Sequence, residues 1–294
     1  MKKDVGNPLF SSLFPLVGKE NKIIEAKNKI VIFLDILGFA NLTLENKLDI
    51  EAIKEQDGPF DEKMKRILTE RIFTGRYTSN KLTKVFSSFH STLEGGLRLA
   101  RMQCHFTSIT FSDSAFIVTH NVNEAVTVIN YLMCSFLQYG VPVRAGIALG
   151  TFEAIRFKSD IKTDSGEHAS HFLGTGVVRA CQAESCGIKG MRILIHPSMG
   201  ELSEKKTTNN MLFQDCDNSE IDNSIGVKKE INYWDYNVTN EKTAWGMFQK
   251  MWKEAPEESK KHYEATANAI QKMRIAKGYP LIKNLKRVSI SRKH

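Results

Sequence analysis

The chain has 294 residues, of which 41% are hydrophobic and 25% charged, the composition of a globular protein that can bury a sizeable core without disulfides or bound metals. No apolar stretch approaches the length of a membrane span, and the N-terminus lacks the apolar run of a signal peptide. We therefore expect a cytoplasmic protein with no membrane partner. The net charge of +8 favours a polyanionic partner, either nucleic acid or a small molecule such as a triphosphate.

The cysteines do not predict a zinc site or a disulfide framework. Their number is odd, their spacing is irregular and no C-x-x-C pair occurs. They are Cys104, Cys134, Cys181, Cys186 and Cys216. We expect them to be reduced thiols.

The first clear element is the apolar run at residues 30–34 (IVIFL), which predicts a strand buried on both faces. Asp35 stands at its end. Residues 45–79 are polar and predict an insertion of short helices and loops, and apolar residues at steps of three and four then predict an amphipathic helix over 82–97.

The next segment predicts a hairpin and a helix. Two strands between His105 and Thr119 meet at a tight turn over residues 112–114 (SDS). Asn123 is the expected cap of a helix whose apolar stripe spans 126–137 and ends at Gly140.

Four strands and several helices are expected beyond the hairpin. The strands are placed at 143–149, 151–155, 193–195 and 231–236, and a helix at 174–184. From Glu241 onward the pattern is helical and charged, with Pro256 opening a further helix and a basic stretch after Lys283.

The order strand, helix, strand, strand, helix, strand is a βαββαβ plan, the ferredoxin-like or palm arrangement of an α+β fold. We assign residues 1–240 to one domain, with an N-terminal arm and a helical insertion at about 45–100. Residues 241–294 form a helical, basic C-terminal extension in this assignment.

Asp35 and Asp113 are the main candidates for chemistry. A carboxylate at the end of an apolar strand needs a cation or backbone donors, because burying it unpaired costs free energy. Asp113 lies at the tip of the predicted hairpin, which a βαββ plan places beside the first strand. The two carboxylates with the Ile36 carbonyl would suit two divalent ions, Mg²⁺ or Mn²⁺. The alternative is that Asp35 caps a loop and Asp113 fills a turn.

Two further features would serve a triphosphate. Gly38, Phe39 and Ala40 follow the first strand directly, where backbone N–H groups at a helix start could bind phosphate oxygens; an ordinary strand-to-helix turn is the alternative. Arg144 could pair with a nearby carboxylate, and its guanidinium fork would also suit phosphate oxygens.

Four segments together resemble the class III nucleotide cyclases. Residues 33–39 (FLDILGF) resemble the first metal motif of that family, and residues 111–114 (FSDS) resemble the second. Residues 143–150 (VRAGIALG) are similar to the family strand Arg-x-Gly-Ile-x-x-Gly, and residues 174–180 (GTGVVRA) to the start of the interface helix. They occur in family order, so the resemblance implies a class III cyclase palm for residues 30–236.

The chain departs from the purine cyclases at three positions. Ile109 stands where adenylate and guanylate cyclases carry a purine-reading lysine. Val178 and Gln182 replace the asparagine and arginine that stabilise the transition state, and Arg179 is the nearest cation. These departures resemble the pyrimidine cyclases of Pycsar anti-phage defence.

The resemblance therefore implies a uridylate or cytidylate cyclase that converts UTP or CTP to the 3′,5′-cyclic nucleotide and pyrophosphate. It implies a homodimer with shared sites, in which Arg179 stabilises the developing charge, and a separate effector protein that senses the product. The alternatives are a catalytically inactive nucleotide-binding module, a purine cyclase, and a palm-type polymerase or nucleic-acid binder. No nucleic-acid-binding motif is present, so we expect no nucleic-acid partner.

Overall fold

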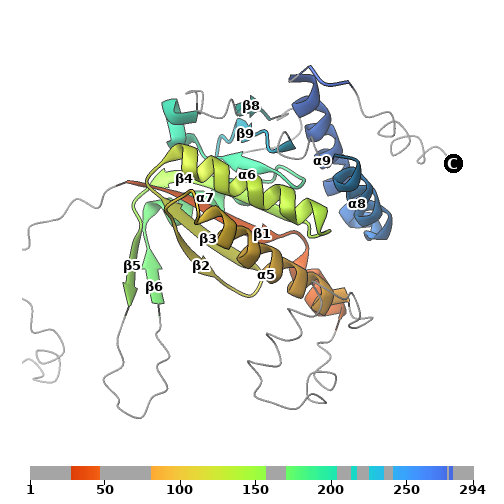
Figure 1. Cartoon of the computed structure of the whole chain (residues 1–294), viewed down its shortest axis with the longest axis horizontal. Helices are drawn as coiled ribbons and strands as arrows, with labels where there is room; N and C mark the ends of the chain where they lie inside the picture. The colour runs from red at the N-terminus through yellow and green to blue at the C-terminus, as the bar shows by residue number, and fades with distance from the viewer. Residues whose placement is uncertain are drawn as a thin grey trace, which may run out of the picture.

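The computed structural model describes residues 28–46, 81–156, 170–203, 213–216, 225–234, 241–276 and 278–280. The centre of the fold is a seven-stranded sheet in the order β2-β3-β1-β4-β7-β9-β8 (Figure 1). Its strands are β1 (Lys29–Ile36), β2 (Thr107–Thr110), β3 (Ser114–Thr119), β4 (Val143–Gly150), β7 (Ile193–Ile195), β8 (Phe213–Asp215) and β9 (Lys229–Ile231). A separate two-stranded sheet holds β5 (Glu153–Arg156) and β6 (Ser170–Leu173).

Helices cover both faces of the large sheet. Figure 1 shows α5 and α6 side by side across one face, with α7 behind the sheet. The helices are α2 (Phe39–Glu45), α5 (Lys81–Ala100), α6 (Val122–Gln138), α7 (Thr175–Glu184), α8 (Glu241–Glu254) and α9 (Glu257–Ala276), with a 3-10 segment η1 (Pro197–Ser203). The elements β1, α5, β2, β3, α6 and β4 follow one another as the sequence predicted, which confirms the α+β fold and its βαββαβ core.

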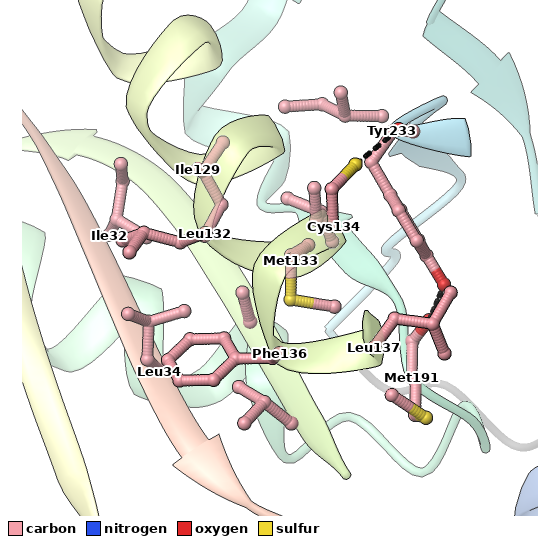
Figure 2. Packing of buried hydrophobic residues seen from close by; sticks show 14 of the residues in the cluster. Ile32, Leu34, Ile129, Leu132, Met133, Cys134, Phe136, Leu137, Met191 and Tyr233 are labelled. Carbon is pink, nitrogen blue, oxygen red and sulfur yellow. Dashed lines mark hydrogen bonds between the residues drawn. The ribbon is translucent and has the colours of Figure 1, made fainter. Parts of the chain in front are cut away.

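Alternation along β1 decides which side chains face which helices. Ile32 and Leu34 pack on α6 in the main core, as Figure 2 shows, whereas Val31 and Phe33 belong to a second cluster on the α7 face. Successive side chains of a strand point to opposite faces. Asp35 therefore faces α7, on the same side as Val31 and Phe33.

Three glycines let α7 lie directly on β4 and β1. A Cβ at Gly146 would lie 2.1 Å from the Ala180 carbonyl oxygen, and one at Gly150 would lie 2.4 Å from the backbone nitrogen of Gly176. A Cβ at Gly176 would meet Val31 at 2.6 Å. The glycines of the segment VRAGIALG are thus needed for close helix-to-strand packing.

The C-terminal helices α8 and α9 share the main core. Trp245 and Phe248 of α8 and Ile270 and Met273 of α9 are buried in it. Trp234 also lies in this core, in T-shaped contact with Trp245 at 6.3 Å. The tryptophans at 234 and 245 therefore serve packing.

Two local predictions were wrong. The cap of α6 is Asn121, whose side chain accepts a hydrogen bond from the Asn123 N–H at 2.8 Å, so Asn123 lies inside the helix. The last strand, predicted at 231–236, is β9 at Lys229–Ile231. The polar stretch at 47–80 and the basic residues after 280 lie outside the described residues. No described helix is long and apolar enough to cross a membrane.

Candidate functional site

The register of three neighbouring strands places the predicted site residues at one end of the sheet. Asp35 stands opposite Ser114 on β3 and opposite Arg144 on β4. The Ile36 N–H donates to the Asp113 carbonyl at 3.1 Å. The structure therefore places the hairpin turn with Asp113 beside Asp35, as the βαββ plan predicted, and adds Arg144 from β4.

Hydrogen bonds hold the hairpin that carries Asp113. The Ser112 hydroxyl donates to Asp113 Oδ1 at 2.8 Å. His90 of α5 lies 2.9 Å from the Ser112 carbonyl oxygen through Nε2, which must carry the proton because a carbonyl only accepts. The His90 ring also packs on Phe86 and Phe89. His90 is thus a positioning residue that ties α5 to the hairpin tip.

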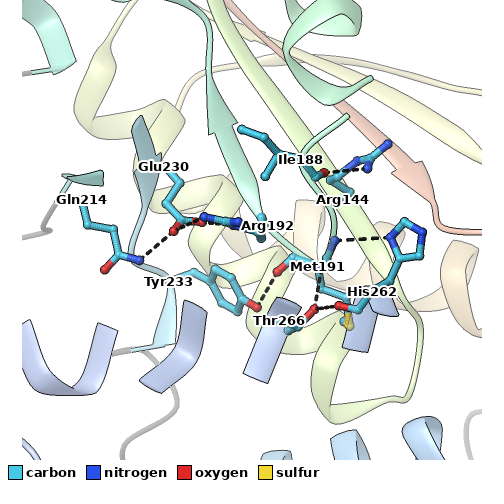
Figure 3. A network of polar contacts seen from close by, with 10 residues as sticks. Arg144, Ile188, Met191, Arg192, Gln214, Glu230, Tyr233, His262 and Thr266 are labelled. Atoms are coloured by element: carbon cyan, nitrogen blue, oxygen red, sulfur yellow. Dashed lines mark hydrogen bonds and ion pairs between the residues drawn. The ribbon is translucent and has the colours of Figure 1, made fainter. Parts of the chain in front are cut away.

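Arg144 is held by α7 and the loop after it. Its Nη2 pairs with Glu184 Oε1 at 2.6 Å, and its Nε donates to the same oxygen at 2.7 Å. Its Nη1 donates to the Ile188 carbonyl at 3.0 Å, the contact that Figure 3 draws. The Arg144 guanidinium therefore forms an ion pair with a carboxylate, Glu184, which was one of its two expected roles. All three of its nitrogens have partners within the protein.

The site concentrates negative charge around Asp35. Burial raises the pKa of Asp35 to about 7, with further contributions from Glu184 and Asp113, and Arg144 and the Ile36 N–H oppose the rise. Two neighbouring carboxylates disfavour the ionised form of a third, and an added cation would reverse that effect. The electrostatics of this end of the sheet favour a bound cation.

The donor set fits a hard divalent metal ion. Two carboxylates, Asp35 and Asp113, share one end of the sheet with main-chain carbonyls, and oxygen ligands of this kind suit Mg²⁺ or Mn²⁺. In the described part of the chain, no group of three or more His, Cys, Asp or Glu is arranged to hold a metal ion. An ion here would take its remaining ligands from a substrate and water, as Mg²⁺ commonly does.

The turn after β1 exposes backbone. Gly38 has a φ of 76°, a left-handed conformation that a side chain disfavours, and a Cβ there would meet nothing within 4 Å. Helix α2 begins at Phe39, and its first intrahelical bond runs from the Leu42 N–H to the Gly38 carbonyl at 3.0 Å. The N–H groups of Phe39 and Ala40 lie in the first turn, where an α-helix leaves donors free.

Arg179 lies far from the two aspartates of its own chain. Its Nη1 donates to the Leu149 carbonyl at 3.0 Å. Leu149 pairs with Ile30, five residues before Asp35 on β1, so the backbone that Arg179 contacts is about 17 Å along the strands from Asp35. Burial and the Arg179 charge lower the pKa of His196, which follows β7. Arg179 does not complete the site of its own chain.

Sequence reasoning missed Glu184 and His90. Glu184 stands 40 residues after its partner Arg144. The sequence suggested that Arg144 could pair with a carboxylate but did not identify Glu184 as that carboxylate. His90 looked like one polar position on an amphipathic helix. Neither residue carried a local signal.

No protein-family profile matches the chain, and a search of curated proteins found no match. Solved structures similar to it are adenylyl and guanylyl cyclases. The guanylate cyclase domain of RhGC from Catenaria anguillulae, in complex with GTP, is 14% identical with a TM-score of 0.43, over 70% of this chain and 96% of that one. The adenylyl cyclase CyaB from P. aeruginosa is 16% identical with a TM-score of 0.43, over 70% and 94%. An adenylate cyclase from Trypanosoma brucei is 13% identical with a TM-score of 0.42, over 70% and 88%.

Proposed function

We propose that the chain is a metal-dependent nucleotide cyclase that acts on a pyrimidine nucleoside triphosphate. The observation that carries this proposal is the approach of the Asp113 turn to Asp35 at one end of the sheet, where burial, Glu184 and Asp113 raise the pKa of Asp35 to about 7. Such a cluster of carboxylates is unfavourable by itself and becomes favourable when a cation binds.

In this proposal Asp35, the Ile36 carbonyl and Asp113 hold two divalent ions, Mn²⁺ or Mg²⁺. Bound ions supply Lewis acidity at the ribose 3′-OH and neutralise phosphate charge. The reaction forms the bond from O3′ to the α-phosphorus, breaks the bond from that phosphorus to the bridging oxygen, and releases pyrophosphate and the hydroxyl proton.

The protein orients the triphosphate with backbone and with charge. The N–H groups from Gly38 to Ala40 bind phosphate oxygens at the start of α2. Arg144 contributes its positive charge beside Asp35 and contacts the triphosphate by exchanging one of its bonds to Glu184 or Ile188. Neutralising charge that develops in the transition state is the largest catalytic effect open to such residues.

The catalytic unit in this proposal is a homodimer. Arg179 is bonded to backbone about 17 Å along the strands from Asp35, which is too far for it to act on its own site in this position. Val178, one residue before it, is 57% exposed on α7. A second protomer that covered this face would bring its Arg179 to the aspartates of the first.

The apolar surroundings of Ile109 favour a pyrimidine over a purine as the base of the substrate. Ile109 packs in an apolar cluster with Phe33, Phe116 and Phe172 on the face that Asp35 shares. A purine whose polar edge met this cluster would lose hydrogen bonds to water without replacement, which costs free energy. We place UTP ahead of CTP as the substrate. In the proposed role, anti-phage defence, a separate effector protein senses the cyclic product.

The test is incubation of the purified protein with each of the four nucleoside triphosphates and Mn²⁺, followed by mass measurement of the products. Cyclic UMP or cyclic CMP as the main product would support the proposal. Cyclic AMP or cyclic GMP would overturn the pyrimidine assignment.

A second candidate is a nucleotide-binding module without catalysis. The absence of the usual asparagine and arginine at Val178 and Gln182 favours it. Nucleotide binding by calorimetry without pyrophosphate release from any of the four triphosphates would establish this candidate instead.

A further inference from the structure

A cavity of about 640 Å³ lies between the turn after β1 and the C-terminal helices. Leu37 and Gly38 form one wall, α5 a second, and α8 with α9 the third. The volume is in the range of pockets that bind small organic molecules. The C-terminal extension thus builds a hollow directly against the turn that follows Asp35.

The cavity is separate from the proposed metal centre. Neither Asp35 nor Asp113 lines it, and Arg144 does not line it either. Asp35 points to the α7 face, whereas the cavity is lined from α5, whose apolar residues pack in the core on the opposite face. The two sites share only the turn at Leu37 and Gly38, whose Leu37 N–H donates to the Pro142 carbonyl at 2.8 Å.

The interior of the cavity is apolar and adaptable. Three methionines line it, two from α8 and one from the segment before β7, together with Val85 and Tyr263. They are Met191, Met247 and Met251. Methionine side chains are flexible and polarisable, so they fit apolar bodies of varied shape.

Cations surround this apolar interior. Lys81 and Lys84 of α5 line the cavity, as do Lys250 of α8 and Lys261 of α9, and all four are exposed. None of them makes an ion pair with another described residue. Three glutamates also line the cavity, so the cations exceed the anions by one. An apolar interior edged by ammonium groups complements a molecule with an apolar body and an anionic head.

His262 adds a fixed donor to the wall. Burial, with the charges of Arg144 and two lysines, lowers the pKa of His262 to about 4, so the ring is neutral. Its Nδ1 accepts a hydrogen bond from the Gly190 N–H at 3.4 Å, as Figure 3 shows. The ring proton therefore lies on Nε2, which can donate to a bound molecule.

We propose that this cavity is a second ligand site, which binds a small organic anion with an apolar body. The lysines hold the anionic head and the methionines contact the body. This proposal is independent of the cyclase activity, because its test is a direct binding measurement without turnover.

The probe is 8-anilinonaphthalene-1-sulfonate, an aromatic sulfonate whose fluorescence rises in apolar surroundings. We expect saturable binding of one molecule per chain to the wild-type protein. Lys84→Glu combined with Lys250→Glu should weaken binding about tenfold or more, because two favourable charges become unfavourable. Met247→Trp, which adds bulk to the cavity, should weaken binding as well.

Matched controls use residues outside the cavity. Lys242→Glu combined with Lys253→Glu makes the same change of charge on α8 at two exposed positions. Met102→Trp places the same bulk at a methionine that is 80% exposed. Both controls should bind the probe within about twofold of the wild type, a difference well under the 1.4 kcal/mol of a tenfold change.

Two results would overturn the proposal. The first is equal affinity of the cavity variants and their controls. The second is displacement of the probe by pyrophosphate or by the α,β-methylene analogues of UTP or ATP, which would make the cavity a part of the substrate site. If the wild-type protein forms no cyclic nucleotide and the probe still binds as expected, the functional assignment fails and the second site stands.

Discussion

Arg179 Nη1 lies 3.0 Å from the carbonyl oxygen of Leu149, at the end of β4 remote from the aspartates. In the proposed homodimer, this contact holds the arginine away from the aspartates of its own chain, so that it would act on the site of the partner protomer. Arg179→Ala should therefore lower kcat by about 10²-fold or more with little change in substrate binding, as for a group that acts on transition-state charge.

Mixing of variants tests the shared site. Asp35→Asn and Arg179→Ala, each inactive alone, should regain roughly a quarter of the wild-type activity when mixed in equal amounts, because half of the dimers then hold one intact site of two. A fully active monomer by light scattering would contradict the dimer, and a wild-type kcat for Arg179→Ala would assign the role to another cation.

The raised pKa of Asp35 makes the metal-free protein less stable at higher pH. The folded state holds the Asp35 proton up to about pH 7, whereas the unfolded chain loses it near pH 4. Between these two pH values the folded state binds more protons than the unfolded chain. The Asp35 proton therefore contributes to the free energy of unfolding in full below about pH 4, and this contribution is lost as the pH rises through 7.

Asp35→Asn removes this dependence. After allowance for solvent screening of a partly buried group, we expect the metal-free variant to be more stable than the wild type by about 1 to 2 kcal/mol at pH 8, with a smaller difference at pH 4.5. Urea unfolding at the two pH values measures it. Glu94→Gln, at an exposed position on α5, is the control and should show no such difference. A wild type that was as stable as the variant at pH 8 would count against the charge cluster.

Gly146→Ala should destabilise the fold by about 2 to 4 kcal/mol, because the new Cβ would lie 2.1 Å from the backbone oxygen of Ala180. Gly95→Ala is the matched control. It lies in α5 with nothing within 4 Å of the new Cβ, and alanine favours helix over glycine by about 1 kcal/mol. The Tm should therefore fall for Gly146→Ala and rise for Gly95→Ala. A similar Tm for both variants would refute the close packing of α7 on β4.

The βαββαβ core could be predicted because its signals are local. The apolar run before Asp35, the hairpin around Asp113 and the helical stripes each occupy one stretch of sequence, and the strand order then follows from the plan. The convergence of Asp35 and Asp113 was predictable for the same reason.

The contacts that decide the remaining features are long-range. The run at 231–236 has the composition of a strand, yet among its described residues, 231–234, Ile231 alone pairs with a neighbouring strand. Asn232 Nδ2 donates instead to the Met273 carbonyl at 3.2 Å, and the Tyr233 hydroxyl donates to the Met191 carbonyl at 2.7 Å. These bonds to α9 and to the segment before β7 turn the chain into the core. The pair of Arg144 with Glu184 is hidden from sequence reasoning in the same way.

The most direct test of the account is pyrophosphate release from UTP with Mn²⁺ by the wild-type protein and by Asp35→Asn and Asp113→Asn, each shown to be folded by circular dichroism. Asp215→Asn, at an exposed aspartate of β8, is the control for loss of one carboxylate. We expect pyrophosphate release by the wild type to be matched by cyclic nucleotide and the control to be active. Each site variant should lose about 10³-fold or more, since each removes a charged ligand that the metal ions require. Full activity in a folded variant at either aspartate would contradict it.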